Sequence, residues 1–177
     1  IVEIGPGKGA LTRELAALAA ASGVAFRLGA SIQRIDAAGS EVSAVVVDGE
    51  RLQADAYVVA CGSWSASLLA PLGIRLPVYP AKGYSATLPL SADSIAPSVS
   101  LTDDGYKIVF SRLGERLRIA GTAEFNGYNT DLNPVRCAAL MRRTSLLFPE
   151  LRPAGPPEFW CGLRPATPSN VPWIGRT

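Results

Sequence analysis

Two stretches of the chain repeat apolar residues at helical spacing. Leu11, Leu15 and Leu18 lie on one face, and Gly23 stands where a helix over these residues would end. Residues 134–151 show the same period, which predicts an amphipathic helix. Its predicted apolar face consists of Ala138, Leu140, Leu147 and Phe148, and its polar face carries Arg136, Arg142 and Arg143.

Between these helices the apolar residues alternate or run continuously, which predicts strands. Residues 41–54 carry a hairpin signal, because Asp48-Gly49 is a favoured two-residue turn between strand-like arms. Residues 106–125 predict two further strands around a turn at 113–116. The remaining predicted strands are 1–4, 24–28, 31–36, 55–61 and 76–90, and a brief helix is predicted over 65–73. Strands in the middle and helices at the edges predict an α+β (mixed α/β) fold.

Composition narrows the class of protein and of chemistry. The 177 residues are 48% hydrophobic and 18% charged, which suits one folded domain or part of a larger one. Because histidine is absent, a Ser-His-Asp or Cys-His mechanism and a histidine-ligated metal are excluded. The net charge of +2 comes without a dense basic run, and we expect no nucleic-acid partner.

Cysteine spacing and hydropathy bear on the protein's location. Cys61, Cys137 and Cys161 are far apart and form no CxxC pair, so we expect a reducing, cytoplasmic compartment and no metal site. No apolar run approaches the roughly 20 residues that cross a bilayer, and the first residues lack a basic signal-peptide region. The chain begins in a strand-like run without methionine, from which we expect a fragment.

The first ten residues form a glycine-rich turn between a predicted strand and a predicted helix. Gly5-x-Gly7-x-x-Ala10 fits a dinucleotide-binding turn, in which glycines let a phosphate approach the backbone at a helix N-terminus. Residues 3–12, EIGPGKGALT, also resemble motif I of the ribosomal RNA adenine dimethyltransferases, which binds S-adenosylmethionine.

The rest of the chain lacks what should follow such a turn. An acidic residue is expected at the end of the second strand, about 20 residues on, to hold a ribose. Here the next acid is Asp36, beyond another strand-like run, and the methyltransferase tetrapeptide Asn-Leu-Pro-Tyr is missing. A strand–turn–helix without any ligand is therefore the alternative interpretation of residues 1–12.

The longer part of the chain resembles a different family. Four blocks carry the likeness, residues 11–35, 55–90, 105–128 and 159–177. They follow the order and spacing of the D-amino acid dehydrogenases, which are flavoproteins of the D-amino acid oxidase and glycine oxidase group. The resemblance implies FAD-dependent oxidative deamination of a D-amino acid to a 2-oxo acid and ammonia. It also implies a respiratory quinone chain as electron acceptor and peripheral attachment to the inner face of the cell membrane.

The same resemblance implies a division of the chain into three segments. Residues 1–75 would be part of an FAD-binding domain, and residues 76–160 a substrate-binding domain built on an antiparallel sheet. Residues 161–177 would begin the return to the FAD-binding domain.

Two residues are implied as catalytic. Arg164, in GLRPATP, matches the arginine that pairs with the substrate carboxylate, a role that suits the two parallel hydrogen bonds of a guanidinium. The alternative is an arginine that braces a proline-rich loop. Tyr84, in YPAKGYS, would close the pocket or, alternatively, satisfy its hydroxyl at the edge of the core. Tyr106 and Tyr128 share this ambiguity.

Seven residues are implied as contacts of the cofactor, and they are Ser31, Ile32, Ala60, Gly62, Ser63, Gly162 and Pro165. Trp160 and Trp173 are interpreted as packing residues.

Parts of the family pattern have no counterpart here. The GxGxxG strand–turn–helix and the acidic ribose ligand should lie upstream, and a glycine-rich segment should follow residue 177. We therefore expect a truncated dehydrogenase-like flavoprotein that binds FAD weakly or not at all. Strand edges left by truncation favour a homodimer. Two other functions stay open, an S-adenosylmethionine-dependent RNA adenine methyltransferase and a non-enzymatic remnant that binds a small carboxylate or a partner chain.

Overall fold

The computed structural model describes residues 10–176 and divides them into two compact units. The first unit reaches Pro77 and includes the last residues from Ile174, and the second unit spans Val78–Trp173. The glycine turn at residues 1–9 lies outside the described residues, so neither interpretation of its role is tested. Each unit has its own sheet and is described by itself.

The first unit contains a helix and a three-stranded antiparallel sheet. Helix α1 (Ala10–Ala21) confirms the first predicted helix, and Gly23 follows it with a φ of 87°. The strands, in the order in which they pair, are β1 (Ile32–Ala38), β2 (Glu41–Val47) and β3 (Glu50–Leu52).

The predicted hairpin between β2 and β3 is confirmed. Asp48 and Gly49 have φ values of 50° and 83°, and a tight hairpin turn of this type requires positive φ at both positions. The Asp48 carboxylate also accepts a hydrogen bond from the Ser31 amide at 2.9 Å, which ties the turn to the start of β1. A short helix α2 (Ser65–Leu69) follows, flanked by 3₁₀ turns at Gly62–Trp64 and Ala70–Leu72.

Two predicted strands of the first unit do not form. Residues 24–28 and 55–61 are irregular, and the three-stranded sheet includes neither. Val58, in the middle of the second segment, is 89% exposed. An apolar run becomes a strand only when a neighbouring strand accepts its backbone hydrogen bonds, and no described strand lies in that position. The predictions were wrong because they inferred burial from the side chains alone.

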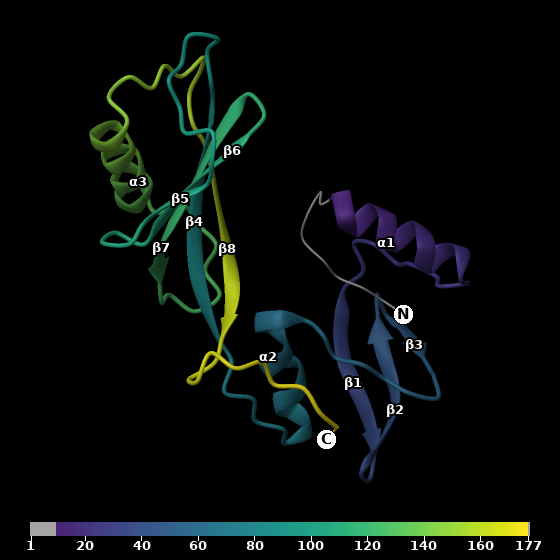
Figure 1. Cartoon of the computed structure of the whole chain (residues 1–177). Coiled ribbons are helices and arrows are strands. Elements are labelled where there is room, and N and C mark those ends of the chain that lie inside the picture. Colours follow the sequence, from purple (N-terminus) through teal and green to yellow (C-terminus); the bar gives the residue numbers. More distant parts are fainter. Residues whose placement is uncertain (1–9, 177) are drawn as a thin grey trace. The chain divides into compact units, whose positions relative to one another are not determined.

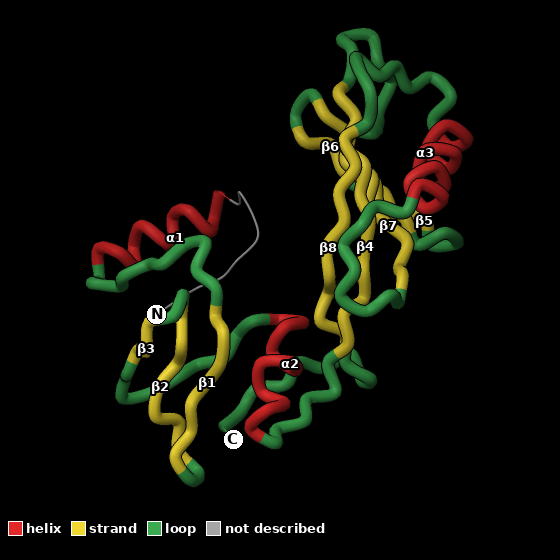
Figure 2. Tube along the Cα trace, turned by 180° about the vertical axis from the view of Figure 1, so that it is seen from behind, coloured by secondary structure: helices red, strands yellow, loops and turns green. Residues whose placement is uncertain are grey.

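The second unit is a five-stranded antiparallel sheet with a helix on one face (Figure 1). Its strand order is β5-β6-β7-β4-β8, which confirms the predicted antiparallel sheet and the strands predicted around the 113–116 turn. The elements are β4 (Tyr79–Pro89), β5 (Leu101–Asp103), β6 (Ile108–Leu113), β7 (Arg116–Glu124), α3 (Pro134–Leu147) and β8 (Glu158–Ala166). Figure 2 shows the same sheet from behind, with α3 packed against it.

The core of this unit lies between α3 and the sheet. The helix begins at the N-cap Asn133, whose side chain accepts a hydrogen bond from the Val135 amide at 3.0 Å. Its buried residues are Cys137, Leu140 and Thr144. The sheet contributes Tyr84, Ala86, Leu88, Ile108, Phe110, Leu117 and Ile119.

The helix prediction is confirmed, but its predicted apolar face is partly wrong. Leu140 is buried as expected, whereas Ala138 and Leu147 are exposed. Cys137 and Thr144, three residues before and four residues after Leu140, complete the buried stripe instead. Phe148, just after the helix, packs edge-on against Phe110 with 5.0 Å between ring centroids.

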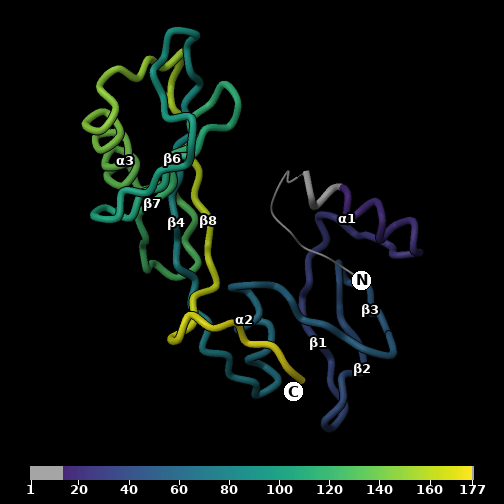
Figure 3. Tube along the Cα trace, viewed as in Figure 1, coloured from purple at the N-terminus to yellow at the C-terminus, as the bar shows by residue number. Residues whose placement is uncertain are grey.

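The last strand joins the sheet from far along the chain. Figure 3 shows β8, in yellow, alongside the teal β4, and the two are paired from Tyr79↔Ala166 to Thr87↔Glu158. The implied third segment, 161–177, therefore begins inside a strand of the second unit, while the implied boundary after residue 75 lies near the division at Pro77. Across residues 10–176 no helix combines the length and the apolar composition of a bilayer crossing.

Candidate functional site

Two strands of the second sheet place Arg164 on the face opposite to α3. In the pairing of β4 with β8, Ala81 lies opposite Arg164 and Gly83 opposite Gly162. Side chains alternate between the faces of a sheet. Because Tyr84 and Ala86 point into the core beneath α3, the neighbouring Gly83 belongs to the other face, and so does Arg164.

The side chains of Arg164 and Trp160 lie over the two paired glycines. A Cβ atom added to Gly83 would lie 2.6 Å from Cζ of Arg164, so the guanidinium rests directly on the backbone there. A Cβ atom added to Gly162 would lie 2.2 Å from Cη2 of Trp160, so the indole covers that glycine. We call Gly83, Trp160, Gly162 and Arg164 the glycine patch.

The guanidinium and the indole are neighbours on this face. Residues directly opposite in an antiparallel pair have Cα atoms about 4.5–5.5 Å apart, and the two side chains rest on such a pair, Gly83 and Gly162. Arg164 is exposed, and among the described residues it has no hydrogen-bond or ion-pair partner. Its donors are therefore free to bind an anion, and a carboxylate fits the planar guanidinium best.

Trp160 packs against the protein through only part of its surface. It is 54% exposed, and the guanidinium of Arg118 on β7 lies 6.0 Å from its ring centroid. The sequence interpretation as a packing residue thus describes the contact with Gly162 but not the exposed remainder of the indole.

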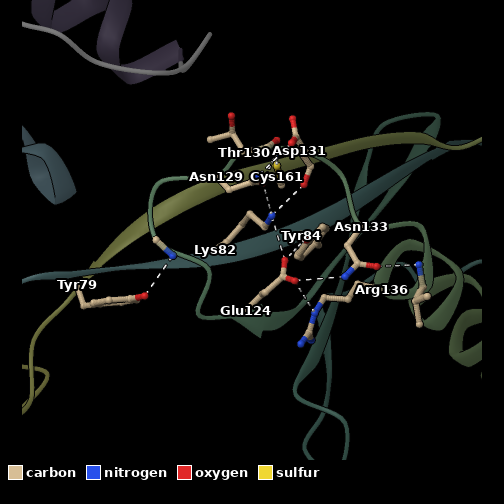
Figure 4. A network of polar contacts seen from close by, with 12 residues as sticks. Tyr79, Lys82, Tyr84, Glu124, Asn129, Thr130, Asp131, Asn133, Arg136 and Cys161 are labelled. Carbon is tan, nitrogen blue, oxygen red and sulfur yellow. Dashed lines mark hydrogen bonds and ion pairs between the residues drawn. The ribbon is translucent and has the colours of Figure 1, made fainter.

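A buried polar network lies on the other face of the same strands (Figure 4). Lys82 is 1% exposed, and its Nζ lies 3.0 Å from Oε2 of Glu124. Nζ also donates to the Asp131 carbonyl at 2.9 Å and to Oδ1 of Asn129 at 3.3 Å. The ammonium charge is therefore fully compensated, as a buried charge requires.

Glu124 is the shared acceptor of this network. The Tyr84 hydroxyl donates to Oε2, and Nδ2 of Asn133 donates to Oε1 at 3.3 Å. Arg136 on α3 adds a longer ion pair, with Nε 3.9 Å from Oε1. The same carboxylate thus ties together β4, β7 and the start of α3 (Figure 4).

A β-bulge places Glu124 on this face. Tyr84 pairs with Gly121 and Gly83 with Ala123, so Thr122 is the extra residue. Thr122 has a φ of 57°, which is rare for a β-branched side chain. Without the extra residue the alternation would turn Glu124 to the face of the glycine patch; with it, Glu124 lies opposite Lys82.

The network sets the charge states of its members. Hydrogen bonds from Tyr84 and then Lys82 lower the pKa of Glu124 from 4.5 to about 2. Burial lowers the pKa of Lys82, but its contacts with Tyr84 and Glu124 raise it by more, so the net pKa is raised. Burial, followed by the bond to Glu124, raises the pKa of Tyr84. At neutral pH the network holds a carboxylate, an ammonium and a neutral phenol.

The network also anchors the segment between β7 and α3. Besides the bonds of Lys82, the Cys161 thiol donates to the Thr130 carbonyl at 2.9 Å. At the other end, the Gly127 amide donates to the Tyr79 hydroxyl at 3.1 Å. Residues 125–133 are thereby tied to both β4 and β8.

The structure places the residues implied by the sequence as follows. Arg164 and Gly162 meet in the glycine patch, and Pro165 is next on β8. Tyr84 is buried with its hydroxyl bonded to Glu124, the arrangement of a tyrosine at a core edge. The other implied cofactor contacts, Ser31, Ile32, Ala60, Gly62 and Ser63, belong to the first unit.

Some residues of this region were missed or misread from the sequence. The spacing Trp160-x-Gly162-x-Arg164 places all three on one face of a strand, a signal that was available. The Lys82–Glu124 pair had no such signal, because the bulge at Thr122 changes which face Glu124 occupies. Among the described residues no group of three His, Cys, Asp or Glu could hold a metal ion.

Comparisons with known proteins agree on one family. Residues 8–177 match the family model described as FAD dependent oxidoreductase. A D-amino acid dehydrogenase of Dechloromonas aromatica is 64% identical over 171 residues, covering 94% of this chain and 41% of that protein. One of Xylella fastidiosa is 49% identical over 166 residues, covering 94% of this chain and 38% of that protein. The chain thus spans about two fifths of the length of these relatives.

Solved structures give the same fold. The crystal structure of glycine oxidase from Geobacillus kaustophilus superimposes with a TM-score of 0.77 at 25% identity, over 94% of this chain and 44% of that one. An L-proline dehydrogenase from P. horikoshii gives a TM-score of 0.77 at 18% identity, over 94% of this chain and 46% of that one. The second likeness supports the fold alone.

Proposed function

The chain belongs to the family of FAD-dependent oxidoreductases, and from this premise we propose that it is the substrate-binding part of a D-amino acid dehydrogenase. The observation that carries the proposal is the exposed guanidinium of Arg164, which rests on Gly83 and has no partner among the described residues. The whole enzyme would deaminate D-amino acids oxidatively to 2-oxo acids and ammonia.

Arg164 would hold the substrate through its α-carboxylate. Two parallel N–H···O bonds fix both the position and the plane of a carboxylate, which a lysine cannot do. The backbone of β4 at Gly83 supports the guanidinium from below, so it reaches the substrate in a defined orientation. Such anchoring would present the same edge of every substrate to the reacting centre.

The described residues do not by themselves fit a complete FAD site. The segment 55–61 leads to the implied contacts Gly62 and Ser63, but its residues are exposed or half-buried and pair with no described strand. A dinucleotide needs a backbone that a sheet holds in place. We therefore expect this chain alone to bind FAD weakly or not at all, and we assign no reaction step through the cofactor.

The same proposal includes the electron acceptor, the membrane attachment and the oligomeric state of the enzyme. A quinone chain as electron acceptor and peripheral attachment to the inner membrane face follow from the family resemblance. A homodimer is supported by β8, which is an edge strand whose outer side pairs with no other described strand.

The proposal is tested in a chimera that replaces the matching 41% of the Dechloromonas aromatica enzyme with this chain. We expect the chimera to reduce an artificial dye with D-alanine. Arg164→Lys should lower kcat/KM about 100-fold, because a charge-assisted bidentate pair becomes a point contact. Arg116→Lys, an exposed arginine on β7, is the control and should change it less than twofold. A chimera that retains flavin but is inactive, or an Arg164→Lys variant with full activity, would overturn the proposal.

A further inference from the structure

We propose that the exposed part of the Trp160 indole is the surface on which the substrate side chain packs, so that the site selects D-amino acids with apolar and aromatic side chains. This inference rests on the proposed role of Arg164 as the carboxylate anchor. It assigns a substrate class within that function and a residue that determines it.

The first support is the distance between the two side chains. Arg164 and Trp160 are four residues apart on β8 and rest on the directly paired Gly83 and Gly162. A carboxylate bound to Arg164 therefore brings the α-carbon and its side chain within reach of the indole. Between them the backbone carries no side chain, so nothing on the strands separates the two.

The second support is that the Trp160 indole is held in place but only partly covered by the protein. Trp160 is 54% exposed although tryptophan gains much free energy from burial. One part of it is held against Gly162, and Arg118 lies 6.0 Å from its ring centroid. A flat apolar surface that is fixed in this way loses little conformational entropy when an apolar group covers it.

The third support is the chemistry of the surrounding face. The positions of β4 that flank Gly83 on this face are Ala81 and Ser85, both small and buried. The groups that lie over the paired glycines are the Arg164 guanidinium and the Trp160 indole, and the Arg118 guanidinium lies 6.0 Å from the centroid of that indole. Of these three groups the indole is the one with an apolar surface, so an apolar substrate side chain beside Arg164 would pack on Trp160.

The test measures binding to the purified chain by NMR titration of backbone amide N–H signals, which every variant retains. D-alanine and D-phenylalanine share the α-carboxylate and ammonium, so the difference between them reports the side chain. We expect D-phenylalanine to bind about five- to tenfold more tightly, from apolar area covered on one ring. Trp160→Thr should abolish this difference and leave D-alanine within twofold of its original affinity, whereas Trp160→Phe should retain part of it.

A second variant moves the indole without removing it. In Gly162→Ala the new methyl group would occupy the place of the Trp160 ring, so the preference for D-phenylalanine should again be lost. Trp173→Phe, an exposed tryptophan after β8, is the matched control and should leave both affinities unchanged. Thermal unfolding of each variant shows that the sheet is intact.

The outcomes separate this inference from the function on which it rests. Arg164→Lys could weaken the binding of both ligands while Trp160→Thr leaves the preference for D-phenylalanine unchanged. Arg164 would then be the carboxylate anchor, and the inference about Trp160 would be wrong. Tighter binding of D-glutamate than of D-phenylalanine would also overturn it, because Arg118 rather than the indole would then select the side chain. If neither ligand shifts any signal, or if Arg164→Lys changes nothing, the carboxylate anchor fails and the inference fails with it.

Discussion

At the scale of single residues, the Glu124 carboxylate contributes to how the second unit responds to acid. Its pKa is about 2 in the folded protein, against 4.5 for an ordinary glutamate, chiefly because Tyr84 donates to it. A lowered pKa means that the folded state favours the charged form. The resulting stability is fully present above about pH 4.5 and is lost as the pH falls towards 2.

This predicts a pH-dependent melting temperature for the second unit. Between pH 4.5 and pH 2 the wild-type transition should fall, and in Glu124→Gln it should fall less over the same range. At pH 7 the variant should melt below the wild type, because Lys82 keeps a buried charge without its carboxylate. Circular dichroism melts at several pH values measure both effects. Parallel curves for the two proteins below pH 4.5 would contradict the assignment.

Alanine in place of two glycines on neighbouring strands, Gly83 and Gly121, should change stability by different amounts. In Gly83→Ala the methyl group meets the end of the Arg164 side chain, which can move, so stability should change by less than about 0.5 kcal/mol. The affinity of Arg164 for a carboxylate should nevertheless fall, because the methyl group displaces the guanidinium from its position on Gly83. In Gly121→Ala the methyl group meets the Lys107 carbonyl at 2.9 Å, and the backbone cannot yield. We expect a loss of about 1–3 kcal/mol in urea unfolding; equal stabilities for the two variants would refute the distinction.

At the scale of elements, the bulge in β7 holds the strained residue Thr122. Its φ of 57° is unfavourable for a β-branched residue, and its buried Oγ1 has no hydrogen-bond partner. Thr122→Gly should therefore raise the free energy of unfolding by about 1 kcal/mol, measured by urea denaturation. The register should persist, so the low pKa of Glu124 should remain. A destabilised variant would mean that the threonine side chain contributes more packing than its strain costs.

The same strand shows what the sequence could and could not predict. Local signals sufficed to predict the Asp48-Gly49 hairpin and the turn at residues 113–116, because a few adjacent residues determine the geometry of a tight turn. The face on which Glu124 lies could not be predicted, since one bulged residue reverses the alternation. The strand predictions for residues 24–28 and 55–61 were wrong for a different reason. Whether these segments form strands depends on partner strands from other parts of the protein.

For the candidate site, prediction from the sequence depended on the kind of interaction. Arg164 was identified from the resemblance, and its exposed, unpartnered guanidinium is compatible with the implied role. The place of Trp160 beside it follows only from the pairing of Gly83 with Gly162, which joins strands about 80 residues apart. Such long-range pairings determine which side chains meet at a site, but the sequence of neither strand alone reveals them.

At the scale of the whole molecule, the unpaired segments lead to a prediction about the cofactor. The purified chain, incubated with FAD and desalted, should be colourless or carry well under one flavin per chain. The reason is that residues 55–61 precede Gly62 and Ser63 without a neighbouring strand to hold them in place for the cofactor. The measurement is the visible flavin absorbance per protein after desalting.

The chimera with the Dechloromonas aromatica enzyme is the control for this experiment. It contains the same 55–61 segment, but the relative's remaining 59% surrounds it with the rest of that protein. We expect the chimera to retain flavin and the chain alone to lose it, so that the difference measures what the added polypeptide contributes to cofactor binding. Arg164→Lys in the chimera should leave the flavin content unchanged, because the anchor is assigned to the substrate. Stoichiometric flavin in the chain alone would show that the chain holds FAD without further strands, and would contradict this prediction.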